Sequence, residues 1–226
     1  VYVRLNYDNA GHTSLLRISD GTEVRSDGHY LNVGHNDDGD RYGSLQATNV
    51  TFTSLDEDGT WPGIVFHNNS RDGTHSLASY LDGCIIENAT DGVYAVSSHP
   101  VLTNGTFRNN VDGVDADDGA MPEITNNTFE GNTRPISVYA ARIDSTIYGN
   151  TYVDNIKDYI EVQGDEFGNG TYVWARDGGP YVLNGIVYVR LNYDNAGHTS
   201  LLRISDGTEV RSDGHALNVG HNDDGD

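Results

Sequence analysis

The residues best suited to chemistry in this 226-residue chain are the aspartates of the segment VDGVDADDGA. Strand alternation would turn Val114 and Ala116 inward and leave Asp115 and Asp117 on one outward face, about 7 Å apart. Asp118 follows at a turn. Carboxylates paired in this way bind Ca²⁺ or act as acid and base on a sugar. The leading interpretation is a solvated acidic face with no catalytic residue, and the three aspartates are the alternative catalytic set.

A second acidic cluster lies in the motif HNDDGD, which occurs twice in the chain. Its side-chain oxygens suit Ca²⁺, although the motif lacks the full spacing of a standard calcium loop. We therefore expect no cofactor, with Ca²⁺ as the alternative. The candidate ligands for that ion are Asn36, Asp37, Asp38 and Asp40, together with Asp115 and Asp117.

The charge of the chain limits its partners. A formal net charge of −21 argues against binding to nucleic acid or to an anionic membrane surface. No run of 18 apolar residues is present, so we expect no membrane insertion. Elimination on a uronate sugar needs a base and cations beside it, but the basic residues Arg108, Arg134, Arg142 and Lys157 are scattered. We therefore predict that the chain is not an enzyme.

Two features of the sequence are compatible with an association with sugars. The chain has 14 tyrosines and 2 tryptophans, and such rings stack on sugars when they lie on a flat surface. Surface polysaccharide is thus a possible partner, and core packing is the alternative role for the rings. The candidate rings are Tyr94, Tyr139, Tyr172, Trp61 and Trp174. Among the Asn-X-Ser/Thr sequences, the loop residue Asn68 is the best candidate for glycosylation.

The chain repeats itself with a period of about 22 residues. Three apolar columns share this period, and each unit holds short alternating segments separated by Gly, Asn and Asp, which predicts short strands and not helices. One such unit cannot bury its inner face alone, whereas stacked units share a continuous core. We expect an inward stack of Ile85, Phe107, Phe129 and Tyr152. The flanking columns are Tyr80, Leu102, Ile124 and Ile147 upstream, and Val93, Val114, Ile136 and Ile160 downstream.

Asparagine recurs three residues after each member of the inward stack. We expect these side chains to form a hydrogen-bonded ladder with a structural role, because Asn also tolerates the left-handed backbone of a sharp corner. The predicted ladder is Asn88, Asn110, Asn132 and Asn155. Together these patterns predict an all-β fold, a parallel β-helix with turns of about 22 residues.

The segments PVLTNGTFRNN, PEITNNTFEGN and STIYGNTYVDN carry a resemblance to right-handed parallel β-helix proteins with pectate-lyase-like repeats. The resemblance covers nearly the whole chain and implies a secreted or cell-surface protein. It does not by itself imply an activity, because this fold carries enzymes, adhesins and scaffolds. The polygalacturonases of this architecture have a Lys where ARIDST has Asp144, which argues against hydrolysis here.

Residues 187–226 repeat residues 1–40 with one difference, Ala216 in place of Tyr30. We interpret residues 1–186 as one complete module of about eight turns and residues 187–226 as the start of a second module that continues the solenoid. The duplicated turns should then be equivalent. An engineered overlap would give the same duplication and remains the alternative.

The sequence therefore predicts a structural, extracellular or cell-surface module of a tandem array or filament, such as a fibre, sheath, stalk or adhesin shaft. Its main partner would be itself, head to tail, through strands that keep stacking across the boundary. The alternative is a carbohydrate-binding or polysaccharide-processing β-helix that uses Asp115 and Asp117.

Overall fold

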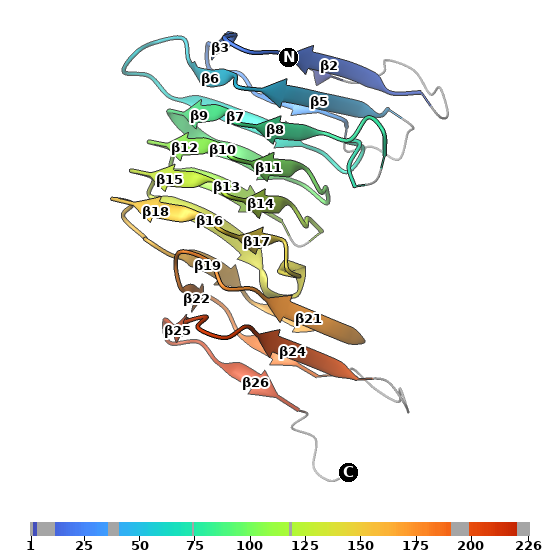
Figure 1. The fold of residues 1–226 in the computed structure, drawn as a ribbon, viewed down its shortest axis with the longest axis vertical. Helices are drawn as coiled ribbons and strands as arrows, with labels where there is room; N and C mark the ends of the chain where they lie inside the picture. The colour runs from blue at the N-terminus through green and yellow to red at the C-terminus, as the bar shows by residue number, and fades with distance from the viewer. Residues whose placement is uncertain are drawn as a thin grey trace.

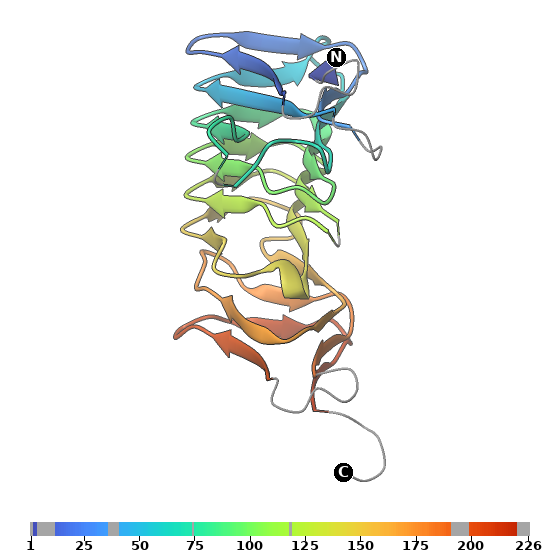
Figure 2. The same ribbon diagram turned by 90° about the vertical axis from the view of Figure 1, so that its right-hand side faces the viewer.

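The protein is a coil of short parallel strands stacked along one long axis (Figures 1 and 2). The computed structural model describes residues 2–3, 12–35, 41–73, 75–117, 119–190 and 199–220. One rung of the coil runs through three strands, one in each of three sheets called A, B and C, and the next rung lies directly beneath it. Every strand pairing described is parallel, which confirms the predicted parallel β-helix.

Sheet A is the longest and runs through the whole coil. Its nine strands are β1 (Tyr2–Val3), β4 (Leu31–Val33), β7 (Trp61–Phe66), β10 (Ala89–Ala95), β13 (Asp112–Ala116), β16 (Arg134–Tyr139), β19 (Ile160–Gln163), β22 (Tyr181–Leu183) and β25 (Val210–Ser212).

Sheets B and C cover the upper part of the coil. Sheet B holds β2 (Ser14–Ile18), β5 (Gly43–Thr48), β8 (Tyr80–Asp82), β11 (Val101–Thr103), β14 (Glu123–Thr125) and β17 (Ile147–Tyr148). Sheet C holds β3 (Glu23–Ser26), β6 (Thr51–Ser54), β9 (Ile85–Glu87), β12 (Thr106–Arg108), β15 (Thr128–Glu130) and β18 (Thr151–Val153).

Two further sheets lie below β19, and one of them, sheet E, continues the face of sheet B (Figure 1). Sheet D holds β20 (Asp165–Phe167), β23 (Val187–Val189) and β26 (Leu217–Val219), and sheet E holds β21 (Gly170–Trp174) and β24 (Ser200–Ile204). The helical structure among the described residues is one 3₁₀ turn, η1 (Ala140–Arg142).

The corner between sheets B and C depends on a left-handed backbone. In five successive rungs the corner residue has φ between 50° and 72°. Only Gly adopts this conformation freely, and Asn is the residue that tolerates it best after Gly. The corner residues, in rung order, are Asn49, Gly83, Asn104, Asn126 and Gly149.

The inward stack differs from the prediction in one member. Phe107 and Phe129 stack with ring centroids 5.0 Å apart, and Tyr152 lies 5.7 Å below Phe129. Above Phe107, however, strand register places Ile86, which is 1% exposed, and Ile85 pairs with Thr106 at the surface. The prediction of Ile85 was wrong because this rung is one residue shorter than the period assumed.

The same one-residue offset affects the upstream column, where Leu81 and not Tyr80 lies in register with Leu102. The downstream column is confirmed, because its four members pair in register and are all 0% exposed: Val93, Val114, Ile136 and Ile160.

Three of the four predicted asparagines form the ladder. The Asn110 amide nitrogen donates to Asn132 Oδ1 (3.1 Å), and the Asn132 amide nitrogen donates to Asn155 Oδ1 (3.0 Å). Each Oδ1 also accepts the backbone N–H of the residue above it. Asn88 is not a member, since the equivalent position is Ala89, whose N–H donates to Asn110 Oδ1. The left-handed corner is formed instead by the residue that directly precedes each ladder position. Asn88, which precedes Ala89, is one of these corner residues and has φ 56°.

A second ladder, at the corner between sheets B and C, was not predicted. Asn127 Oδ1 accepts from the backbone N–H of Gly105 (2.8 Å), and Asn150 Oδ1 accepts from that of Asn127 (2.9 Å). Asp177 continues the series by accepting from the N–H of Asn150 (2.7 Å). The sequence signal was present, because Asn127 and Asn150 each directly precede the Thr of an Asn-Thr pair.

The two copies of the repeated segment form the same turn in different sheets. Tyr2 pairs with Asn32 between β1 and β4, and the equivalent Tyr188 pairs with Asn218 between β23 and β26. The first pair of strands belongs to sheet A and the second to sheet D. The predicted equivalence of the duplicated turn therefore holds for the pairing register, but the repeat spans seven turns, from β2 to β24 on one face of the coil (Figure 1), instead of about eight turns.

The Asn ladder should contribute strongly to stability. Asn132→Ala would leave the N–H of Asn110 and the carbonyl of Phe107 without partners in a site that is 0% exposed. We expect a loss of at least about 2 kcal/mol of unfolding free energy in urea denaturation. The exposed Asn68→Ala is the matched control and should change it by less than about 0.5 kcal/mol. Equal effects of the two variants would contradict a structural ladder.

Candidate functional site

A hollow of about 210 Å³ lies on the outer face of sheet A. Strand alternation explains its walls, because Val114 and Ala116 on β13 point into the core and turn Asp115 outward. The hollow is lined by Tyr94, Asp115, Ala116, Asp117, Arg134, Ser137, Tyr139 and Gln163.

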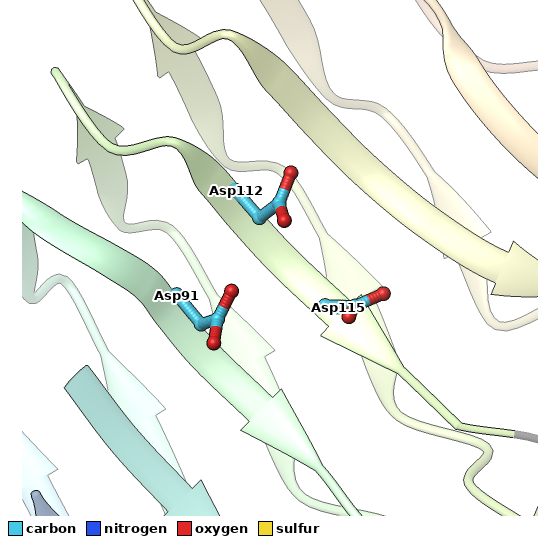
Figure 3. A group of neighbouring side chains, drawn as sticks. All are labelled: Asp91, Asp112 and Asp115. Atoms are coloured by element: carbon cyan, nitrogen blue, oxygen red, sulfur yellow. The ribbon is translucent and has the colours of Figure 1, made fainter. Parts of the chain in front are cut away.

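Three aspartates converge beside this hollow (Figure 3). Carboxylate oxygens of Asp91, Asp112 and Asp115 all lie within 4.8 Å of one another. Asp91 and Asp112 are register partners on β10 and β13. Each is followed by a glycine that faces the core: a Cβ on Gly113 would lie 2.8 Å from Phe129 Cδ1. The Asp-Gly-Val sequence is thus fixed by the inward stack, and it aligns the two carboxylates one rung apart.

The crowding of like charges changes the acidity of two of these groups. Burial, together with the charges of Asp112 and Asp115, raises the pKa of Asp91 from 3.8 to about 6. Burial also raises the pKa of Asp115, although a hydrogen bond from Ser137 and the charge of Arg134 act in the opposite direction.

Arg134 neutralises part of the cluster. Its guanidinium donates to both carboxylate oxygens of Asp112, at 2.7 Å each, and to Glu161 Oε1 at 2.7 Å. The side chain of Glu161 is only 2% exposed. Burial alone would raise the pKa of Glu161, but hydrogen bonds from Lys157 and Arg134 lower it below its usual value. This network joins β13, β16 and β19 across the outer face of sheet A.

The predicted pair Asp115 and Asp117 both line the hollow, but their surroundings differ. Asp117 Oδ1 accepts backbone N–H bonds from Ser97 (2.8 Å) and Gly119 (3.1 Å), so it anchors a loop. Asp115 is grouped with Asp91 and Asp112 instead. The sequence could not reveal this group, because Asp91 lies one rung away and only strand register brings it close.

The Asp91, Asp112 and Asp115 oxygens are of the type that Ca²⁺ prefers. Both oxygens of Asp112 are already hydrogen-bonded to Arg134, and Asp115 accepts a hydrogen bond from Ser137, so the group is partly engaged within the protein. The other predicted ligands, Asn36, Asp37, Asp38 and Asp40, and the alternative catalytic residue Asp118, lie outside the described residues.

Four of the five candidate aromatic residues divide into two groups, and the fifth, Tyr172, packs edge-on against Phe167 with ring centroids 4.6 Å apart. Tyr94 and Tyr139 line the hollow. Trp61 and Trp174 are 2% and 0% exposed, so they belong to the core and the prediction that they could stack on sugars was wrong. Asn68, the glycosylation candidate, lies exposed in a turn after β7.

Comparison of the sequence with known protein families supports the β-helix fold. The chain matches the family model described as a right-handed beta helix region over residues 33–185, and it belongs to that family. The coil is therefore a right-handed parallel β-helix, as predicted. Searches of curated proteins and of solved structures gave no match. Among the described residues, no helix is long and apolar enough to cross a membrane.

The acidity of Asp91 predicts a pH dependence. The pKa of Asp91 is about 6 in the folded chain and near 3.8 in the unfolded chain. Between these pH values the folded state binds more protons than the unfolded state, so ionised Asp91 destabilises the fold, and it does so fully above pH 6. Asp91→Asn should raise Tm by about 2–4 °C at pH 8, and the gain should disappear as the pH falls towards 4.

Calorimetry from pH 4 to pH 8 measures this difference. Asp58→Asn, at an exposed loop aspartate, is the control and should leave Tm nearly constant relative to the parent chain. A Tm gain for Asp91→Asn that does not change with pH would show that like-charge crowding is not its cause.

Proposed function

We propose that this protein is a structural, extracellular module that repeats end to end and joins its neighbours by continued strand stacking. The proposal rests on the two copies of the 40-residue segment. The second copy pairs with the rung above it, and the first copy pairs with the rung below it. The two copies together describe both sides of a junction between modules.

The second copy displays the upstream side of the junction. Its strands β23, β24 and β25 pair with β20, β21 and β22 of the preceding rung. The pairs that define the register are Asp165 with Val187, Gly170 with Ser200, and Tyr181 with Val210. Among the described residues, the ladder is continuous where the first proposed module ends and the second begins.

The first copy displays the downstream side. The strands equivalent to β24, β25 and β26 are β2, β3 and β4, and these pair with β5, β6 and β7 of the following rung. Ser14 pairs with Gly43, Glu23 with Thr51, and Leu31 with Ile64.

Burial supports the proposal that the second copy would receive the same downstream neighbours. Val33 is 0% exposed and is covered by the rung that follows it, whereas the equivalent Val219 is 79% exposed. A Cβ on Gly34 would lie 2.4 Å from the backbone nitrogen of Ser70, but the equivalent Gly220 has nothing within 4 Å. An apolar residue and a close-contact glycine are thus present at the lower edge with no rung against them.

Copies of residues 41–186 placed after the second copy would complete this edge. Each module would add seven turns, or about 34 Å at the spacing of neighbouring strands. A rod built in this way suits a fibre, sheath, stalk or adhesin shaft. The net charge of −21 would keep neighbouring rods apart in solution and favour end-to-end over side-by-side contact.

Matched substitutions in the two copies test this proposal. In the 226-residue chain Val33→Asp should cost more than about 3 kcal/mol, because it buries an unpaired charge, whereas Val219→Asp should cost less than about 0.5 kcal/mol. In a longer chain that continues after Asp226 with a second copy of residues 41–186, Val219→Asp should become as costly as Val33→Asp.

Urea denaturation of the four variants provides the measurement, and negative-stain microscopy of the longer chain should show single rods of twice the module length. If Val219→Asp stays neutral in the longer chain, or if the particles are two beads on a linker, the modules do not join through their strands.

Carbohydrate binding on the hollow of sheet A is a second candidate. The observation that favours it is that Tyr94 and Tyr139 flank polar groups in one open depression. Rings beside hydrogen-bonding groups are a common arrangement for holding sugars. We expect no bond cleavage, since Asp117 is engaged with the backbone and Arg134 with two carboxylates.

Calorimetric titration with neutral oligosaccharides would detect such binding. Tyr94→Ala should weaken it at least about 10-fold, and Tyr148→Ala, at an exposed ring outside the hollow, should not. Incubation with uronate polymers and Ca²⁺ should release no new reducing ends or unsaturated products. Product formation that Asp115→Asn abolishes would instead show that the protein is an enzyme.

A further inference from the structure

We infer that separate 226-residue chains join by exchange of the repeated segment, so that residues 187–226 of one chain replace residues 1–40 of the next, which are released. This inference rests on the proposed end-to-end array. It names how two chains form the junction that a longer chain forms within itself. The partner is a second copy of this chain, and the surface that binds it is the lower edge formed by β24, β25 and β26.

The two copies are interchangeable at this junction because they present the same residues to it. They differ only where Tyr30 corresponds to Ala216. Tyr30 lies between β3 and β4 and is 44% exposed, so the difference falls outside the paired strands. The strands that accept the first copy, β5, β6 and β7, are therefore equally able to accept the second copy of another chain.

The rung below the first copy needs a cover, and either copy supplies the same one. Val24 of the first copy pairs with Phe52, which is 0% exposed, as is Leu45 of the same rung. Release of the first copy without a replacement would bring this apolar core into water. The second copy of another chain carries Val210 at the place of Val24, and so covers Phe52 with the same side chain.

Exchange conserves the pairing between rungs. The first copy pairs with the rung below it, and the second copy pairs with the rung above it. After exchange one second copy pairs on both sides, so the contacts formed between chains equal those broken within a chain. The pairing of β1 with β4 inside the released copy is lost. The released segment regains conformational freedom, which offsets the entropy lost when two chains associate.

Stacking of intact chains fits the upper edge of the first copy poorly. The second copy shows which residues this edge accepts, because Ile204 pairs with Trp174 and Val210 pairs with Tyr181. Both rings are 0% exposed. An intact neighbouring chain would offer the aliphatic residues of β24 and β25 in place of these rings, and the smaller side chains would leave the core at the contact underfilled. Release of the first copy removes this mismatch.

A reversible disulfide tests whether the first copy must be released. Glu23 and Thr51 are register partners, so Glu23→Cys with Thr51→Cys should fasten the first copy to the rung below it. Thr106→Cys with Thr128→Cys, a register pair in the middle of the coil, is the matched control and leaves the first copy free. Cys84 is 1% exposed and should not react in the folded chain.

Analytical ultracentrifugation, in salt that screens the net charge of −21, provides the measurement. The oxidised Glu23→Cys, Thr51→Cys chain should lose the ability to form multimers and regain it on reduction. The parent chain and the oxidised control should form multimers throughout. Multimers of the oxidised, fastened chain would show that intact chains stack, and a parent chain that stays monomeric would show that chains do not join. Either result would overturn the exchange.

A second disulfide separates failure of the exchange from failure of the array. Glu209 is the equivalent of Glu23 and lies near the opposite end of the coil from Thr51, as the places of β25 and β6 show (Figure 1). Oxidation of Glu209→Cys with Thr51→Cys should therefore link positions 209 and 51 of different chains, which mass spectrometry identifies.

In a longer chain that continues after Asp226 with a second copy of residues 41–186, the Thr51→Cys change is placed in the added copy only. The array predicts that positions 209 and 51 then link within one chain. If this link forms and the link between 226-residue chains does not, the array holds and the exchange is wrong. If neither link forms, both are wrong.

Discussion

The backbone hydrogen bond between rungs is the interaction on which this structure depends. Each strand pairs only with strands one rung above and one rung below, as when the His67 N–H donates to the Val33 carbonyl at 2.9 Å. A rung contains no hairpin that could satisfy its own N–H and C=O groups, so it is stable only when other rungs cover it. Growth along one axis follows directly from this constraint.

In-register stacking places equivalent side chains one rung apart, with opposite consequences for different groups. Stacking stabilises amides and aromatic rings, as in the ladder of Asn110, Asn132 and Asn155 and in the stack that begins at Phe107. Stacking of carboxylates is destabilising, because the charges of Asp91 and Asp112 repel each other. Arg134 offsets part of this cost by binding Asp112 and Glu161. The acidic group beside the hollow is therefore largely a product of the repeat, with Arg134 as its counter-charge.

Much of the fold could be predicted because stacking demands the same kind of residue at the same position in each rung. For this reason the sequence predicted the period, the parallel strands and most of the Asn ladder. The phase was misjudged at Ile85 and Asn88, where one rung is a residue shorter. Asp91 could not be grouped with Asp115 without knowing the register. The passage from sheet A to sheet D after Gln163 was also hidden, since it depends on a corner at Gly164 and on packing around Trp174.

The central claim is that the edge formed by β24, β25 and β26 continues the ladder into another module. The most direct measurement is the structure, by electron cryomicroscopy, of a chain that carries a second copy of residues 41–186 after Asp226. The account predicts that Ser200 pairs with the added copy of Gly43, and Leu217 with the added copy of Ile64, as Ser14 and Leu31 pair with Gly43 and Ile64 in the first copy. Two solenoids separated by an unpaired linker, or a different register at this junction, would contradict it.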